Sequence, residues 1–243
     1  MGTSADRTEG SGGAWTPLKH AASNYARTAA RGLGGTRINA QRVLSRHVAV
    51  LGGAAAAAAG ARAGSTGVAR LGGLLAGIGD SGLAPTLTQA GLAGLVGQDR
   101  FEVLDGLITL IAGDAADVDS QAARDAACDV LDELFGDAET WAQLDSVGVT
   151  SSMLEALLTM FLAHYIYNRV PVLAERLARL TDPAAVREAD RQIVQMVQDL
   201  VALRMPDDPL TFDWSGPAGA QFADDAIRDV YEILQNLPQE GRS

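Results

Sequence analysis

The sequence predicts an all-α protein, a multi-helix bundle with a flexible N-terminal tail. Hydrophobic side chains make up 47% of the 243 residues but aromatic ones only 5%, so the core must be built from small and branched aliphatic residues. Such residues suit the close packing of helix against helix. Beyond the tail, apolar residues recur at helical spacing, and the alternation typical of a strand-rich domain is not seen.

Residues 1–14 (MGTSADRTEGSGGA) predict the flexible tail. They are mainly Gly, Ser, Thr and charged residues without apolar periodicity, so burial cannot offset the entropy lost on ordering. They also lack the apolar stretch of a secretion signal, and Asp6 stands where a myristoylation motif has Ser or Thr. We therefore expect a chain that is neither exported nor anchored by lipid.

Residues 15–80 predict a basic, Gly/Ala-rich helical segment. Glycine pairs punctuate it, and those in its last helix indicate that a neighbouring backbone lies close. The expected elements are a helix over about 17–33 that starts at Pro17 and ends at Gly34-Gly35, a helix from Thr36 to near Gly52-Gly53, a frayed helix or mobile connector over 54–66, and a helix over 68–78, followed by a break over 79–85.

Residues 81–243 predict an acidic helical bundle. We expect Ser120, Thr150 or Ser151, and Asp182 to cap helices, and Pro171 to kink or end a long helix near Arg169. Residues 205–214 predict a proline-bearing connector that can include a short extended segment. The expected helices cover 86–95, 100–112, 120–135, 138–145, 151–179, 183–204 and 219–236.

Charge is divided unevenly along the chain. Residues 1–80 hold nine Lys/Arg against three Asp/Glu, and residues 81–243 hold ten against twenty-seven, within a net charge of −11. No acid lies between residues 10 and 79, so three sources could offset the repulsion between arginines there: the acidic remainder of the chain, an acidic protein partner, or nucleic acid. The absence of interleaved aromatic residues weakens the third. The arginines concerned are Arg27, Arg31, Arg37, Arg42, Arg46, Arg62 and Arg70.

Motifs for catalysis are absent from the sequence. One cysteine and three histidines show no metal-ligand spacing, and no phosphate-binding loop of the Walker type exists, so we expect no catalytic site, no cofactor and no metal. His164 lies in an apolar stretch and predicts a hydrogen-bonded histidine of the core or of an interface. Clustered carboxylates, as at Asp114, Asp117 and Asp119, predict a solvated face or a helix N-terminus rather than a cation site.

A membrane span is not expected either. The apolar stretch over 48–79 is interrupted by Arg62 and Arg70, and the stretch over 153–167 is too short. Together with the single cysteine, this predicts a cytoplasmic protein.

Three short motifs resemble a known family. Met1-Gly2-Thr3-Ser4, the block from Tyr25-Ala26-Arg27-Thr28 to Gly34-Gly35-Thr36-Arg37, and Leu95-Val96-Gly97 are together similar to QatB, a component of the four-gene Qat anti-phage defence system. The resemblance implies three neighbours: an ATPase (QatA), a protein like the 7-cyano-7-deazaguanine synthase QueC (QatC), and a TatD-like nuclease (QatD). It implies no enzyme activity for this chain.

The resemblance also suggests a role for the tail. Residue 2 is small, so removal of the initiator methionine would leave a free glycine amine, and QueC-like enzymes adenylate a deazaguanine carboxylate and transfer it to an amine. We hypothesise that Gly2, Thr3 and Ser4 enter the active site of the QueC-like partner, where Gly2 is the acceptor, while the helical body docks on that partner. We expect Tyr25, Arg27, Arg31, Arg37, Arg42 and Arg46 to contact the partner or nucleic acid.

Other interpretations stay open from sequence. The tail can be an ordinary disordered terminus, and the arginine segment can belong to a nucleic-acid-binding accessory protein whose affinity falls steeply with salt. A helical enzyme with an unfamiliar site is the third class.

Overall fold

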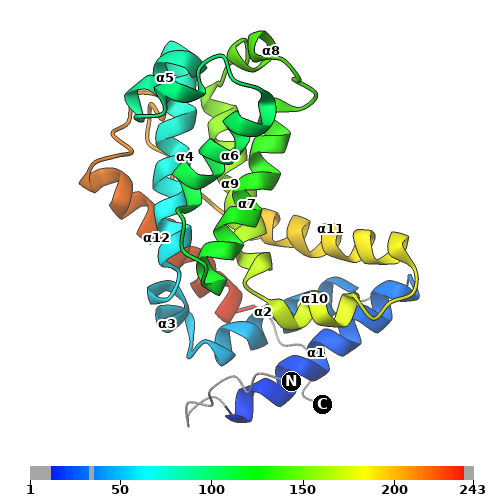
Figure 1. Ribbon diagram of the computed structural model, residues 1–243. Coiled ribbons are helices and arrows are strands. Elements are labelled where there is room, and N and C mark those ends of the chain that lie inside the picture. Colours follow the sequence, from blue (N-terminus) through cyan, green and yellow to red (C-terminus); the bar gives the residue numbers. More distant parts are fainter. Residues whose placement is uncertain (1–11, 33–35, 238–243) are drawn as a thin grey trace. The chain divides into compact units, whose positions relative to one another are not determined.

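The computed structural model describes residues 12–32 and 36–237, and within these ranges the chain folds into helices without any strand (Figure 1). The all-α prediction is therefore confirmed. The helices are α1 (Gly12–Ala30), α2 (Thr36–Val50), α3 (Ala54–Ala59), α4 (Arg62–Ser81), α5 (Leu83–Gln89), the 3-10 helix η1 (Ala93–Leu95), α6 (Arg100–Ala112), α7 (Val118–Phe135), α8 (Trp141–Asp145), α9 (Ser151–Asn168), α10 (Pro171–Leu177), α11 (Pro183–Leu200) and α12 (Pro217–Gln235).

These helices belong to two compact units that are not contiguous in sequence. Helix α12 supplies residues to both, with the boundary after Ile227. The point where the charge changes sign, between residues 80 and 81, falls inside unit 2, in the last turn of α4. Unit 1 comprises Met1–Gly60, Val170–Leu200 and Arg228–Ser243, and unit 2 comprises Ala61–Arg169 and Val201–Ile227.

Unit 1 is built around α1, which packs against α2, α10 and α11. The side chains of Leu18, Ala22 and Tyr25 are fully buried and recur at helical spacing, so one face of α1 forms the core. From α2, Val43 and Leu44 are buried as well. The arginines of both helices lie outside these apolar stripes, which leaves them available for polar contacts.

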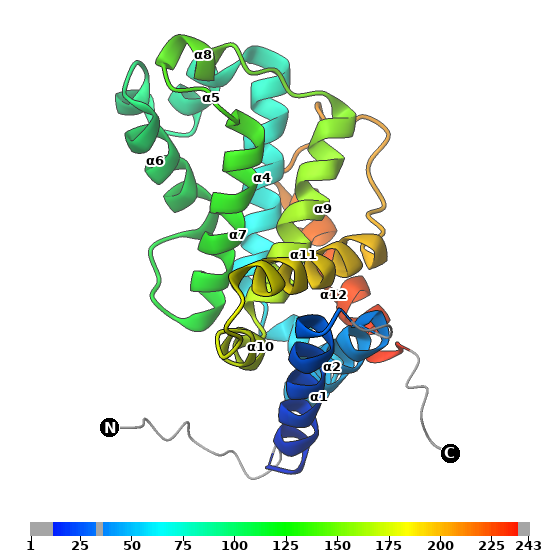
Figure 2. The same cartoon turned by 90° about the vertical axis from the view of Figure 1, so that its right-hand side faces the viewer.

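Unit 2 is built around α4, which packs against α5, α6, α7 and α9. Figures 1 and 2 show α4, α7 and α9 running side by side, and α7 also packs directly on α9. Buried aliphatic residues from all three helices fill the space between them, among them Leu71, Ala123 and Leu158. The core therefore has the small and branched composition that the sequence predicts.

Glycines of α4 accommodate aromatic rings from other parts of unit 2. A Cβ added to Gly64, Gly67 or Gly72 would overlap a ring, that of Tyr165, Phe161 and Trp214 respectively. The sequence correctly indicated close approach along this helix. At these three glycines, however, the group that lies close to the helix is an aromatic side chain and not a neighbouring backbone.

Several predicted boundaries were wrong. Helix α1 begins at Gly12 rather than near Pro17, so residues 12–14 of the expected tail are helical, because proline's fixed φ is compatible with a helix and it forgoes only one backbone hydrogen bond. Helix α4 begins at Arg62, and the break expected over 79–85 is the single residue Gly82, whose φ of 90° ends α4. The predicted helix over 86–95 is α5 followed by η1.

Helix caps agree with the sequence at two of three positions. Thr150 caps α9 by accepting from the N–H of Met153, and Asp182 accepts from the N–H of Ala184 at the start of α11. Ser120 was wrongly expected to cap α7. The cap is Asp117, which accepts from both the N–H and the hydroxyl of Ser120, because an ionised carboxylate is the stronger acceptor.

The long helix expected over 151–179 divides as Pro171 predicted. Helix α9 ends at Asn168, and α10 begins with Pro171 in its first turn. Chain direction can therefore change between them, which places α9 in unit 2 and α10 in unit 1.

Candidate functional site

The predicted modification segment cannot be described. Gly2, Thr3 and Ser4 lie outside the described residues. The geometry of the candidate site therefore comes from the arginine segment and from features that the sequence did not reveal.

Tyr25 serves the core of unit 1. Its side chain is fully buried, and its hydroxyl donates a hydrogen bond to the carbonyl of Ala189 in α11. Burial, assisted by the nearby carboxylates of Asp190 and Glu188, raises the pKa of the Tyr25 phenol well above its usual range. Its position explains why the residue is needed for α1 to pack on α11, and it offers little surface to a partner.

Arg27 and Arg31 lie close to two arginines that are about 150 residues later in the sequence. The four guanidinium-bearing side chains of Arg27, Arg31, Arg176 and Arg179 line one pocket of about 270 Å³ in unit 1. Arg179 forms an ion pair with Glu175 at 2.5 Å, whereas none of the ion pairs between described residues involves the other three. This pocket is a concentration of positive charge on a chain with a net charge of −11.

Arg37 meets the acidic remainder of the chain. Its guanidinium forms an ion pair of 3.2 Å with Asp199 of α11, and both side chains are substantially exposed. Exposed pairs of this kind contribute about 0–1 kcal/mol each. One of the three expected sources of charge compensation is therefore realised here, at small energetic gain.

Two further arginines of α2 lie one turn apart. Arg42 donates to the side-chain amide oxygen of Asn39 at 3.4 Å, and Arg46 is exposed. Their spacing of four residues places both on one side of the helix. This side remains a candidate docking surface for an acidic partner.

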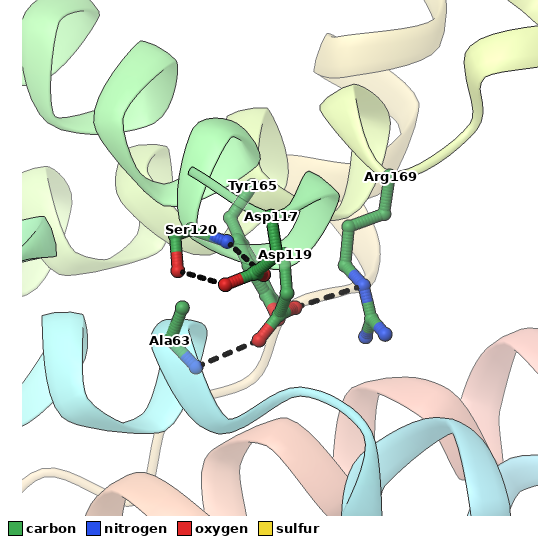
Figure 3. Close-up of polar contacts among 6 residues, drawn as sticks. All are labelled: Ala63, Asp117, Asp119, Ser120, Tyr165 and Arg169. Atoms are coloured by element: carbon green, nitrogen blue, oxygen red, sulfur yellow. Dashed lines mark hydrogen bonds and ion pairs between the residues drawn. The ribbon is translucent and has the colours of Figure 1, made fainter. Parts of the chain in front are cut away.

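A polar network in unit 2 was missed by sequence reasoning (Figure 3). The carboxylate of Asp119 in α7 accepts hydrogen bonds from the N–H of Ala63 at 2.8 Å and from the hydroxyl of Tyr165 at 2.5 Å. It also pairs with Arg169 at 3.2 Å, and the guanidinium of Arg169 lies 5.5 Å from the centre of the Tyr165 ring. Asp119 thus joins α4, α7 and α9.

Asp119 lies in the first turn of α7, in agreement with the expected helix N-terminus, but its side chain is not part of a solvated face. The side chains of Asp119 and Arg169 are only 19% and 10% exposed. Asp119 replaces the missing cap of α4, since Ala61 at the N-cap position offers no side-chain acceptor. Asp117 does lie at a helix N-terminus, as expected, and its hydrogen bonds from Ser120 lower its pKa. Nothing in the sequence spacing relates Asp119 to Arg169.

A second pocket, of about 920 Å³, lies within unit 2. Trp214 forms part of its wall, buried and held by a hydrogen bond from its indole N–H to the carbonyl of Pro209. The rings of Phe212 and Phe222 are edge-on to the Trp214 ring, with 5.0 and 5.1 Å between the ring centres. Aspartates predominate among its charged lining residues, which include Asp80, Asp213, Asp224 and Arg70.

His164 and Cys128 complete the set of chemically distinctive residues. His164 is largely buried and contacts the carboxylate of Asp129 at 2.5 Å, which confirms the expectation of a hydrogen-bonded histidine. Cys128 is exposed, but partial burial and the carboxylate of Asp132 raise its pKa. No group of three or more His, Cys, Asp or Glu suited to a metal ion occurs in residues 12–32 and 36–237.

Over the described part of the chain, the regular secondary structure is entirely helical. Polar contacts join the helices within each unit. The chain matches the family described as Qat anti-phage system associated protein QatB over residues 52–234, and it belongs to this family. It is therefore a component of a Qat anti-phage system. No curated protein and no solved structure matches it.

The match begins after two of the three motifs that carried the resemblance and includes the third, Leu95-Val96-Gly97. It includes all of unit 2 and excludes α1 and α2, with their arginines. Among the helices that can be described, none combines the length and the hydropathy needed to cross a membrane.

Proposed function

We propose that this chain is a non-enzymatic, protein-binding component of its Qat system, and that it docks on a QueC-like partner which uses the N-terminal amine as an acceptor. Membership of the QatB family is the observation that carries the proposal, and a glycine at position 2 supplies the acceptor. The ATPase and the TatD-like nuclease of such systems are further partners.

The proposed chemistry forms one amide bond. The QueC-like partner activates a deazaguanine carboxylate with ATP and releases pyrophosphate. The free amine of Gly2 then attacks the activated carbonyl carbon, AMP leaves with the electron pair of the broken bond, and the amine loses a proton. This chain contributes the nucleophile and its delivery, so it needs no catalytic residue of its own.

Two arginines of α2, Arg42 half-buried and Arg46 exposed, support the docking half of the proposal. Arg42 and Arg46 lie on one side of the helix within a stretch of the chain that has no acidic residue. A partner surface rich in carboxylates would offset their mutual repulsion and would speed association.

Intact-mass measurement tests the acceptor role. We expect the chain co-expressed with an active QueC-like partner to gain the mass of one deazaguanine acyl group, and to remain unmodified with a catalytically inactive partner. Gly2→Pro should prevent the gain because it replaces the primary amine by a hindered secondary one, whereas Gly2→Ala should retain it. An unmodified terminus beside an active partner would overturn the acceptor role.

Co-purification tests docking separately. The double variant Arg42→Glu/Arg46→Glu should lose the QueC-like partner, whereas Arg62→Glu, an exposed arginine outside unit 1, should retain it. Equal recovery of the partner by both variants would exclude the α2 surface. Turnover of a substrate by the isolated chain would contradict the non-enzymatic assignment.

A further inference from the structure

The arginine pocket of unit 1 brings together two segments that are distant in sequence. Arg27 lies on α1 and Arg31 directly follows it, whereas Arg176 lies on α10 and Arg179 lies two residues after the end of that helix. Helices α1 and α10 pack against each other, so the convergence is a property of the tertiary fold. None of the motifs found in the sequence involves Arg176 or Arg179.

The charge of this pocket is only partly compensated. Glu175 pairs with Arg179, and α1 contains no acidic residue. The Nε of Arg176 is buried and has no hydrogen-bond partner among the described residues, although a guanidinium can only donate. A guanidinium that is partly buried without a counter-charge is costly, so an anion held by the arginines of the pocket would offset that cost.

The geometry points to a phosphate-binding site, and we propose that this pocket binds the phosphate group of a nucleotide or of a nucleic acid strand. Arginine forks match phosphate oxygens with paired hydrogen bonds. A volume of about 270 Å³ suits a phosphate with its attached sugar. The remaining lining is Ser23, Ala26, Ala30 and Leu180, which provides no aromatic face for stacking a base, so recognition is independent of base identity.

This site is distinct from the acceptor role of Gly2 and from the α2 docking surface. It uses different residues from Arg42 and Arg46, and all of its residues lie in unit 1. The family match includes Arg176 and Arg179 but not Arg27 and Arg31. A phosphate ligand here would hold α1 and α10 together. Arg27 and Arg31 come from α1 and the residue after it, and Arg176 and Arg179 come from α10 and the turn after it.

Fluorescence anisotropy with the full chain tests the proposal. The probes are a labelled single-stranded 20-mer and labelled ATP, each titrated at two salt concentrations. We expect binding that weakens with salt, and Arg27→Gln/Arg31→Gln should lose on the order of tenfold or more in affinity, because hydrogen bonds to charged groups are the strong ones. Arg62→Gln/Arg187→Gln is the matched control, because it also removes two exposed arginines but neither lines the pocket, and it should bind like wild type.

The outcomes divide clearly. Binding of ATP as well as the 20-mer identifies a free nucleotide as a sufficient source of phosphate, and binding of the 20-mer alone identifies a strand. Arg31→Lys should recover part of the affinity lost by Arg31→Gln, since charge returns without the fork. Absence of binding at low salt, equal affinities of Arg27→Gln/Arg31→Gln and Arg62→Gln/Arg187→Gln, or equal competition by a poly-glutamate peptide would each overturn the proposal.

Discussion

Replacing Asp119 by alanine should destabilise unit 2 more than any change at a neighbouring acid. The substitution removes the acceptor for Ala63, the acceptor for Tyr165 and the carboxylate partner of Arg169 together. Removing one member of a largely buried ion pair costs about 3–5 kcal/mol, and loss of a helix cap costs about 1 kcal/mol. These effects share one side chain and are not additive, so we expect about 3–5 kcal/mol in total.

Urea unfolding followed by tryptophan fluorescence measures this loss in a Trp15→Phe/Trp141→Phe background, where the signal comes from Trp214, which is buried in unit 2. Asp119→Asn keeps one acceptor oxygen and should lie between wild type and Asp119→Ala. Asp114→Ala is the matched control, since Asp114 is exposed, and it should change stability by less than about 0.5 kcal/mol. Equal unfolding midpoints for Asp119→Ala and Asp114→Ala would refute the role of the network.

Three further predictions concern single residues. Gly67→Ala should cost about 1–3 kcal/mol because its Cβ would overlap an aromatic ring, whereas Gly13→Ala meets open space; matching urea midpoints would contradict this. Cys128 should react more slowly than free cysteine with a thiol reagent at pH 8, because its pKa is raised, and Asp132→Asn should accelerate it; a rate at or above that of free cysteine would exclude the effect. The pKa of Asp117 is lowered, chiefly by a backbone N–H of the first turn of α7, so its ionised form stabilises the fold above the ordinary aspartate pKa and this contribution disappears as pH falls through the lowered value. Thermal melts against pH should therefore show a shallower acid limb for Asp117→Asn, and superimposable profiles would count against the cap.

The sequence predicted a helix well where the residues that start, stop or pattern it lie within that helix or next to it. Helix α6 was placed over 100–112 as observed, and the division at Pro171 followed from the missing N–H of proline. Helix α1 starts five residues before Pro17, because proline favours a first helical turn but is also tolerated further along this helix. The capping role of Ser120 was misassigned because Asp117, three residues earlier, competes for the same N–H.

The candidate site could be predicted only in part. The sequence singled out Arg27 and Arg31 by their spacing and by the absence of acids around them. Arg176 gave no signal, because it lies in the acidic part of the chain. The sequence predicts Tyr25 to contact a partner, whereas the structure buries it in unit 1, since periodicity gives the face of a helix and not what packs on that face.

The sequence by itself determined that this protein is helical, where most of its helices run, and that its charges are divided along the chain. Those properties depend on neighbours within a few residues, through periodicity, caps and breaks. Only the tertiary structure decided that Asp119 supports α4 and that arginines of α1 and α10 share a pocket. Such contacts join residues far apart in the chain, and they depend on which helix faces meet during packing, which local propensities leave open.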